Sequence, residues 1–161
     1  TWVERFESRL HEQERKADHL LATFRDSVDI DSEEWEEDLI FVGIWEGRVF
    51  FWTNEIIGDR HLSELLTSGR NFTKIGNTYY EIRRKRYKDI DYYALLRIKD
   101  DYPYTGKYIK NNFGKFLNIS EENIGQVEIS TVTVEQGHLI TDKDGMGLFF
   151  IVYGDHYKER A

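Results

Sequence analysis

The 161-residue chain contains no cysteine, one proline and no long apolar run, and each absence narrows the possibilities. Without cysteine the chain forms no disulfide and no thiolate metal site, although this absence fits an oxidising and a reducing compartment equally well. No stretch approaches the roughly 20 apolar residues that span a bilayer, and the N-terminus lacks the basic-then-apolar order of a signal peptide. As it stands, we expect the chain to be soluble.

Positive charge is scarce as well, since 22 lysine and arginine residues stand against 30 aspartate and glutamate residues, giving a net charge of −8. Nucleic-acid binding depends on basic side chains that neutralise phosphates, so we expect no nucleic-acid partner. The chain does contain 40% apolar and 15% aromatic residues, which favours a folded core within one domain, residues 1–161. It begins at Thr1, without a methionine and inside a helical pattern, so we expect it to be a piece of a longer protein.

Residues 1–28 predict one long helix with a single apolar seam. The seam positions alternate between spacings of three and four residues, with Gln13 filling one gap. The apolar members are Val3, Phe6, Leu10, Ala17, Leu20 and Phe24. Two interpretations stay open, a helix packed along its own domain and a two-helix seam with a second copy, a homodimer in which Gln13 marks the register.

The rest of the chain predicts an α+β core over residues 35–153, with the long N-terminal helix packed on a twisted antiparallel sheet. Alternating or continuous apolar runs bounded by turn residues indicate the strands. They are residues 39–45, 48–52, 78–87, 92–99, 126–134, with a bulge near Ser130, 138–141 and 146–153. Short helices are predicted over residues 58–69 and 105–116.

Basic residues alternate along "RRKRYK", residues 83–88, so on a strand they fall on both faces. One interpretation is an edge that is solvated or paired across strands. The other is an anion or carboxylate site at Arg83, because an arginine that points inward needs a partner.

No motif in the sequence indicates catalysis, a metal or a cofactor. The five histidines lack the spacing of metal ligands, and "DKDG" at residues 142–145 lacks the flanking carboxylates of a calcium loop and predicts a turn. The chain has no P-loop, no GxGxxG and no GxSxG pattern. We therefore expect no enzyme activity, although a glycan-handling enzyme with two distant carboxylates stays open as an alternative.

Aromatic residues gather near the ends of the predicted strands. Most are expected in the core, because they are large apolar bodies with one polar tip. Some lie beside polar residues, where a mostly apolar pocket would hold a small ligand or a sugar. The candidate ligand-binding residues are Trp52, Asn54, Tyr80, Arg83 and Tyr102.

One segment, residues 92–116, resembles part of the extracytoplasmic sensor domains of bacterial transmembrane histidine kinases. Its apolar strand ends in Ile-Lys, continues into a Tyr-x-Tyr turn and leads to a helical pattern. These features lie at Ile98-Lys99, Tyr102, Tyr104, Tyr108-Ile109 and Phe113. The segments "VFFWTN" and "NTYYEIRRK" resemble strands of the same group, and the order of elements resembles PAS-like and Cache-like sensor domains.

This resemblance implies a periplasmic sensor domain within an inner-membrane protein, with flanking transmembrane helices and a cytoplasmic kinase. It would receive an unknown small-molecule or protein signal and transmit it through the N-terminal helix and the C-terminal strand. The alternative from another class is a soluble interaction module that dimerises through the N-terminal helix and binds no small molecule.

Overall fold

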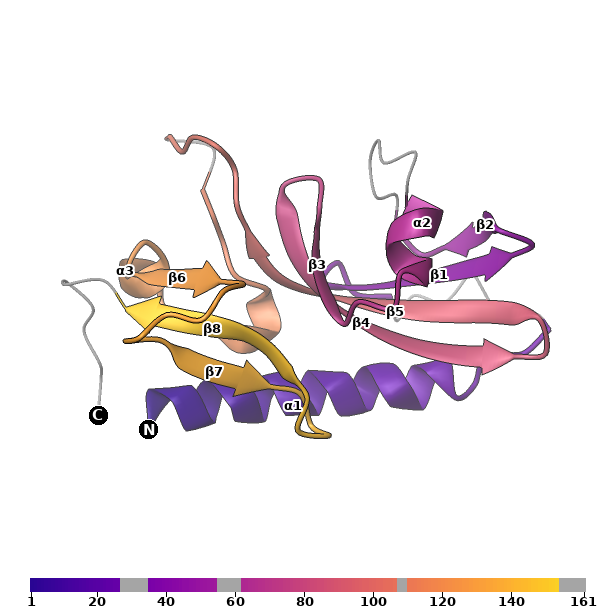
Figure 1. The fold of residues 1–161 in the computed structure, drawn as a ribbon, viewed down its shortest axis with the longest axis horizontal. Helices are drawn as coiled ribbons and strands as arrows, with labels where there is room; N and C mark the ends of the chain where they lie inside the picture. The colour runs from indigo at the N-terminus through magenta and orange to yellow at the C-terminus, as the bar shows by residue number, and fades with distance from the viewer. Residues whose placement is uncertain (27–34, 55–61, 107–109, 154–161) are drawn as a thin grey trace.

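The computed structural model describes residues 1–26, 35–54, 62–106 and 110–153. Its N-terminal helix, α1 (Trp2–Leu21), runs along two antiparallel sheets, as Figure 1 shows. The strands are β1 (Leu39–Trp45), β2 (Arg48–Trp52), β3 (Phe72–Ile75), β4 (Thr78–Tyr87), β5 (Ile90–Asp100), β6 (Val127–Ser130), β7 (His138–Thr141) and β8 (Gly147–Tyr153). The predicted α+β class is confirmed.

The first five strands form one sheet in the order β2-β1-β5-β4-β3, and the last three form a second sheet in the order β6-β8-β7. Three short helical segments lie between strands along the chain. Helix α2 (Leu62–Thr67) lies between β2 and β3, and the 3₁₀ turn η1 (Lys115–Leu117) and helix α3 (Glu121–Ile124) lie between β5 and β6. Helix α1 packs against β4, β5, β7 and η1, so it contacts both sheets. The second sheet lies over the first half of α1 (Figure 1).

The apolar seam of α1 faces the protein's own core. Its buried members include Phe6, Leu10, Ala17 and Leu21. Gln13 is buried too, and its side-chain amide donates to Glu36 at 3.0 Å. The interpretation of a helix packed along its own domain is confirmed, because the seam is covered by residues of the same chain.

Helix α1 begins as its sequence predicts but ends earlier. Thr1 caps it with a reciprocal capping box to Glu4. The helix stops at Leu21, not near residue 28, and residues 27 and 28 lie outside the described residues. Carbonyl groups beyond its end bond to a side chain of the sheet, since Lys85 Nζ donates to Ala22 O at 3.1 Å and to Phe24 O at 2.8 Å.

Two apolar layers hold the fold together. The larger layer lies between α1 and the two sheets, and the smaller one lies between the other face of the five-stranded sheet and α2. In the larger layer, Phe6 joins the sheets, because its ring lies 6.2 Å from Phe113 and 6.2 Å from Phe149 in edge-to-face contacts. Phe72 reaches the same Phe149 ring at 4.7 Å, so β3 and β8 meet there.

The predicted hairpins form where the turn residues indicate them. Between β1 and β2, Glu46 and Gly47 both have positive φ, 50° and 74°, as a two-residue hairpin turn requires. The long pair β4 and β5 is antiparallel, and β7 pairs with β8 across the turn of residues 142–145. The prediction that "DKDG" is a turn is therefore confirmed.

The predicted helix over residues 105–116 is wrong for the part that the structure describes. Residues 107–109 lie outside the description, and the rest contains only the first two residues of η1. Phe113 instead forms an isolated bridge with Lys99 of β5. Gly114 lies so close to that strand that a Cβ there would stand 2.2 Å from Arg97 O, which excludes any larger residue without rearrangement.

Three other boundaries differ from the prediction. Strand β6 ends at Ser130 with no bulge, because the Ser130 hydroxyl bonds locally to the backbone of Val132 at 2.8 and 3.2 Å. Strand β3 is missing from the prediction, because its four residues are too few to show a clear alternation of apolar and polar side chains. Helix α2 ends at Thr67, before the predicted end at residue 69, and residues 58–61 of the predicted helix lie outside the description.

Substitutions at Tyr80 and Trp52 should differ in their cost. Tyr80 is 8% exposed in the layer under α2, whereas Trp52 is 53% exposed on β2. We expect Tyr80→Ala to lower the free energy of unfolding by about 3–5 kcal/mol, as loss of a buried aromatic does. Trp52→Ala should cost less than about 1 kcal/mol. Guanidinium unfolding followed by circular dichroism measures both, and equal losses would contradict this assignment.

Candidate functional site

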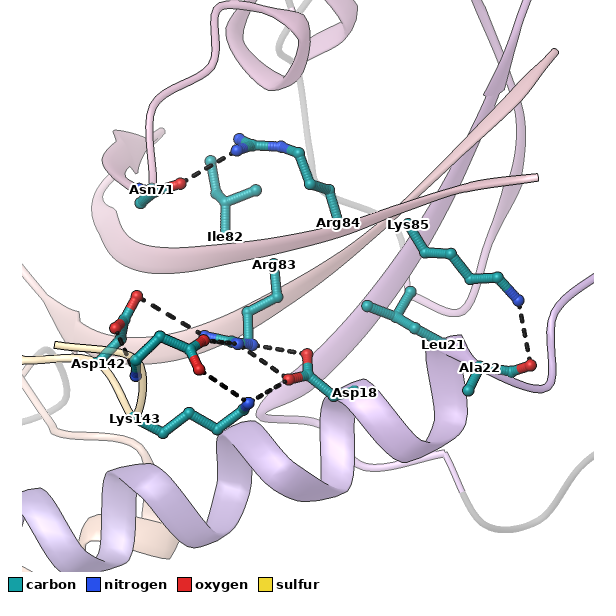
Figure 2. Close-up of a pocket in the computed structure, with 11 residues that line it drawn as sticks. Asp18, Leu21, Ala22, Asn71, Ile82, Arg83, Arg84, Lys85, Asp142 and Lys143 are labelled. Carbon is teal, nitrogen blue, oxygen red and sulfur yellow. Dashed lines mark hydrogen bonds and ion pairs between the residues drawn. The ribbon is translucent and has the colours of Figure 1, made fainter. Parts of the chain in front are cut away.

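The site that the structure supports best is a cleft of about 500 Å³ between α1, β4 and the turn joining β7 to β8. Arg83, one of the predicted ligand-binding residues, lies in its wall (Figure 2). Asp18 enters from α1, and Asp142 and Lys143 enter from the turn. Side chains of opposite charge from three separate elements therefore meet in one place.

The alternation of strand β4 directs Arg83 inward. Ile82 and Arg84 point to the α2 side of the sheet, and Arg83 points to the α1 side with its side chain 11% exposed. Arg84 reaches Asn71 at 3.0 Å on its own side. Of the two arginines Arg83 and Arg84, only Arg83 points inward, so the prediction that an inward arginine needs a partner applies to Arg83.

Asp18 of α1 is the principal partner of Arg83. The guanidinium donates from Nε to Oδ1 at 2.6 Å and from Nη2 to Oδ2 at 2.9 Å, a bidentate pair. Burial alone lowers the pKa of Arg83, but the hydrogen bonds and charge of Asp18, followed by Glu81 and Asp144, raise it above its usual value. Arg83 is thus a permanent cation between α1 and the sheet.

The turn between β7 and β8 completes the charge balance. Arg83 Nη2 donates to Asp144 at 3.1 Å, and Lys143 Nζ lies 3.2 Å from Asp18. The hydrogen bond from Arg83 holds the pKa of Asp144 below its ordinary value, and the hydrogen bond to Asp18 raises the pKa of Lys143. Asp142 lies 3.9 Å from Arg83 Nη1. The second sheet is therefore tied to Arg83 through its turn.

Two buried glutamates lie behind the cleft. Glu14 of α1 is 0% exposed and Glu81 of β4 is 1% exposed. Arg83 Nη1 donates to Glu81 Oε2 at 3.1 Å and lies 3.8 Å from Glu14 Oε2, while Glu14 Oε1 accepts from the backbone N–H of Lys143 at 2.8 Å. We call these residues, Arg83, Glu14, Asp18, Glu81, Asp142, Lys143 and Asp144, the Arg83 cluster.

Glu81 is the acid of the cluster whose protonated form the fold favours. Burial raises its pKa well above the ordinary value, and the hydrogen bond and negative charge of Glu14 raise it further. Glu14 Oε2 and Glu81 Oε1 are buried without another hydrogen-bond partner in the described part of the chain. A proton on Glu81 that is donated to Glu14 satisfies both oxygens and removes one buried charge.

The other four predicted ligand-binding residues lie away from this cleft. Tyr80 is buried on the α2 side of the sheet, and Trp52 is exposed on the edge strand β2. Asn54 follows β2, and Tyr102, 37% exposed, follows β5. Of the five residues, the structure places only Arg83 in this cleft.

Sequence reasoning missed the carboxylates of the cluster. Asp18 is one of many charged residues on α1, so its sequence position alone does not set it apart. Glu14 lies beside the seam position Gln13 and is not itself part of the predicted seam. Their spacing of four residues puts both on one face of α1, which was the available signal. No group of three or more potential ligands that could hold a metal ion occurs within the described ranges.

The chain was compared with known proteins at the levels of family, sequence and structure. No protein-family model, curated protein or solved structure matches it. The resemblance to sensor domains therefore stays a prediction. Among the helices that the structure describes, none combines the length and the apolar character needed to cross a membrane.

Removing the charge of Arg83 should destabilise the fold strongly. Arg83→Met leaves several carboxylates without their cation, and we expect a loss of about 3–5 kcal/mol in the free energy of unfolding. Arg84→Met is the matched control on the other face of the same strand, and it should stay within about 1 kcal/mol of the wild type. Urea unfolding at pH 7 measures both, and a small loss for Arg83→Met would show that the cluster contributes little.

The raised pKa of Glu81 makes stability depend on pH in a defined direction. The folded pKa lies above the ordinary value of 4.5, so between these two values the folded state binds more protons than the unfolded state. Stability should fall as pH rises from about 4.5 to the folded pKa, by up to about 1.4 kcal/mol per pH unit, and then level off. Glu81→Gln, which keeps the shape without the ionisation, should remove this fall.

The control for this pH series is Glu12→Gln, an acid-to-amide change at an exposed position on α1. It should reproduce the wild-type fall in stability. The measurement is the urea midpoint at a series of pH values from 5 to 8 for the three proteins. If the midpoints of the wild type and of Glu81→Gln depend on pH in the same way, the raised pKa of Glu81 is contradicted.

Proposed function

We propose that the chain is an extracytoplasmic, PAS-like or Cache-like sensor domain of a membrane-bound histidine kinase. A small-molecule or protein signal would act on it through the position of α1 relative to β8. The observation that carries this proposal is the joint attachment of α1 to both sheets, with its first turn against the last strand. This geometry connects the interior of the domain to the beginning of α1 and to the end of β8.

The beginning of α1 and the end of β8 lie side by side. The rings of Trp2 and Tyr153 are 5.3 Å apart in an edge-to-face contact. Figure 1 places the beginning of α1 and the end of β8 at the same end of the molecule. A domain inserted between two membrane spans needs this arrangement, because both connections must reach the same membrane surface.

The Arg83 cluster supplies the element that a signal would bias. Its charges hold α1 against β4 and against the turn of the second sheet. A ligand that bound one arrangement of these charges more tightly than another would shift the population of α1 positions. The shift would reach β8 directly, because the turn that contacts Arg83 leads into that strand.

A soluble interaction module is the second candidate. Its predicted contact, the seam of α1, is covered by the domain itself. What favours it is a different surface, the β1–β2 hairpin, where Trp45, Phe50 and Trp52 are 46%, 46% and 53% exposed at the edge of the sheet. Exposed aromatic groups on an edge strand are typical of binding surfaces.

The native gene on both sides of this chain tests the sensor proposal. We expect it to encode an apolar stretch of about 20 residues before the domain and another after it, followed by a kinase, because the signal must cross a membrane. Sequencing the flanking DNA is the measurement. A stop codon soon after residue 161, without an upstream span, would contradict the proposal and favour the interaction module.

A further inference from the structure

Lys99, near the end of β5, is a buried lysine with few polar contacts among the residues that the structure describes. Its side chain is 7% exposed, and Nζ donates to Val127 O at 2.7 Å. The same Nζ lies over the ring of Phe113, 5.1 Å from its centre. An ammonium group has three N–H donors. Within the residues that the structure describes, only one hydrogen bond from this group is formed.

Among the described residues, the charge of Lys99 also lacks a closely matched counter-ion. The nearest carboxylate oxygen among them belongs to Glu128, 3.9 Å away, on a side chain that is 71% exposed. Asp101 contributes from a distance but is paired with Lys74 at 2.9 Å. Burial lowers the pKa of Lys99, and these two carboxylates oppose that shift only in part. A buried ammonium of this kind is stabilised by any anion that reaches it.

A pocket of about 430 Å³ opens beside Lys99, between the end of β5, α3 and β6. Its size falls in the range of small-molecule sites. Lys110 adds a second cation to its wall, and Thr105, Asn111 and Asn112 add neutral polar groups. Glu128 is the one acidic residue among the described residues that line it. Such a positive wall contrasts with the net charge of −8 of the whole chain.

We propose that this pocket binds a small anion, a carboxylate or a phosphate, with the ammonium group of Lys99 as its central ligand. The anion would accept the hydrogen bonds that the described protein groups leave unmade on Nζ. Lysine presents a point charge without the planar fork of arginine, so it suits either anion. The neutral polar groups would then contact the rest of the molecule.

This inference gives the proposed sensor a class of ligand, but it can be tested on the domain alone. Binding of an anion by a chain without flanking membrane spans would contradict the sensor proposal and leave this one intact. Flanking membrane spans without anion binding would support the sensor proposal and contradict the anion site. The two proposals therefore fail independently.

The first experiment is calorimetric titration of the 161-residue chain with acetate, succinate and inorganic phosphate at constant ionic strength. We expect saturable binding of at least one anion, weakened at least tenfold by Lys99→Met, which keeps the length of the side chain and removes its charge. Lys88→Met, at an exposed lysine on the β4–β5 turn, is the matched control and should bind like the wild type. The anion that binds most tightly distinguishes a carboxylate site from a phosphate site.

A second measurement does not depend on the folding of a variant. In wild-type protein labelled with ¹³C-lysine, the Cε signal of Lys99 reports its titration with pH. A bound anion should raise the midpoint of that titration by about one pH unit, a tenfold change in proton affinity. An unchanged midpoint with all three anions would overturn the proposal and leave Lys99 as a structural contact to β6. Equal weakening of binding by Lys99→Met and Lys88→Met would overturn it too, because it would indicate general screening.

Discussion

The burial of Arg83 is the constraint on which the arrangement of the domain depends. A guanidinium group cannot lose its charge, so a position with 11% exposure obliges carboxylates to approach it. They come from three elements: Asp18 from α1, Glu81 from β4 and Asp144 from the turn between β7 and β8. The helix, the first sheet and the second sheet are thereby positioned relative to one another by one side chain.

The same cluster contains more acid than base, and the fold favours the protonated form of one of its acids, Glu81. A hydrogen shared between Glu81 and Glu14 would remove a negative charge where solvent is excluded. Desolvation offsets much of the attraction between buried ionic groups, so their net contribution to stability is smaller than their contacts suggest. We infer that the cluster fixes the position of α1, while the aromatic contacts around Phe6 supply most of the cohesion.

Features that arise from local periodicity were predictable, and those that arise from distant contacts were not. The seam of α1 and the β4–β5 hairpin follow directly from residue spacing. The partners of Arg83 do not, because Asp18 and Asp144 stand 65 and 61 residues away along the chain. The predicted helix over residues 105–116 failed for a related reason. Its apolar spacing fits a helix, but Phe113 bridges to β5 and the following glycine packs against that strand.

Two cations of the five-stranded sheet, the nearly buried Arg83 and the buried Lys99, contact different parts of the second sheet. Arg83 bonds to the turn before β8, and Lys99 bonds to Val127 O at the start of β6. Both contacts are electrostatic, so each responds to an added charge more than an apolar contact would. An anion at Lys99 would take the N–H groups that do not bond to Val127 O, so it would change the charge beside β6 and leave the contact through Arg83 as it is. Strand β6 pairs with β8, which ends beside the first turn of α1, so the charge of Lys99 acts one strand away from the contact between β8 and α1.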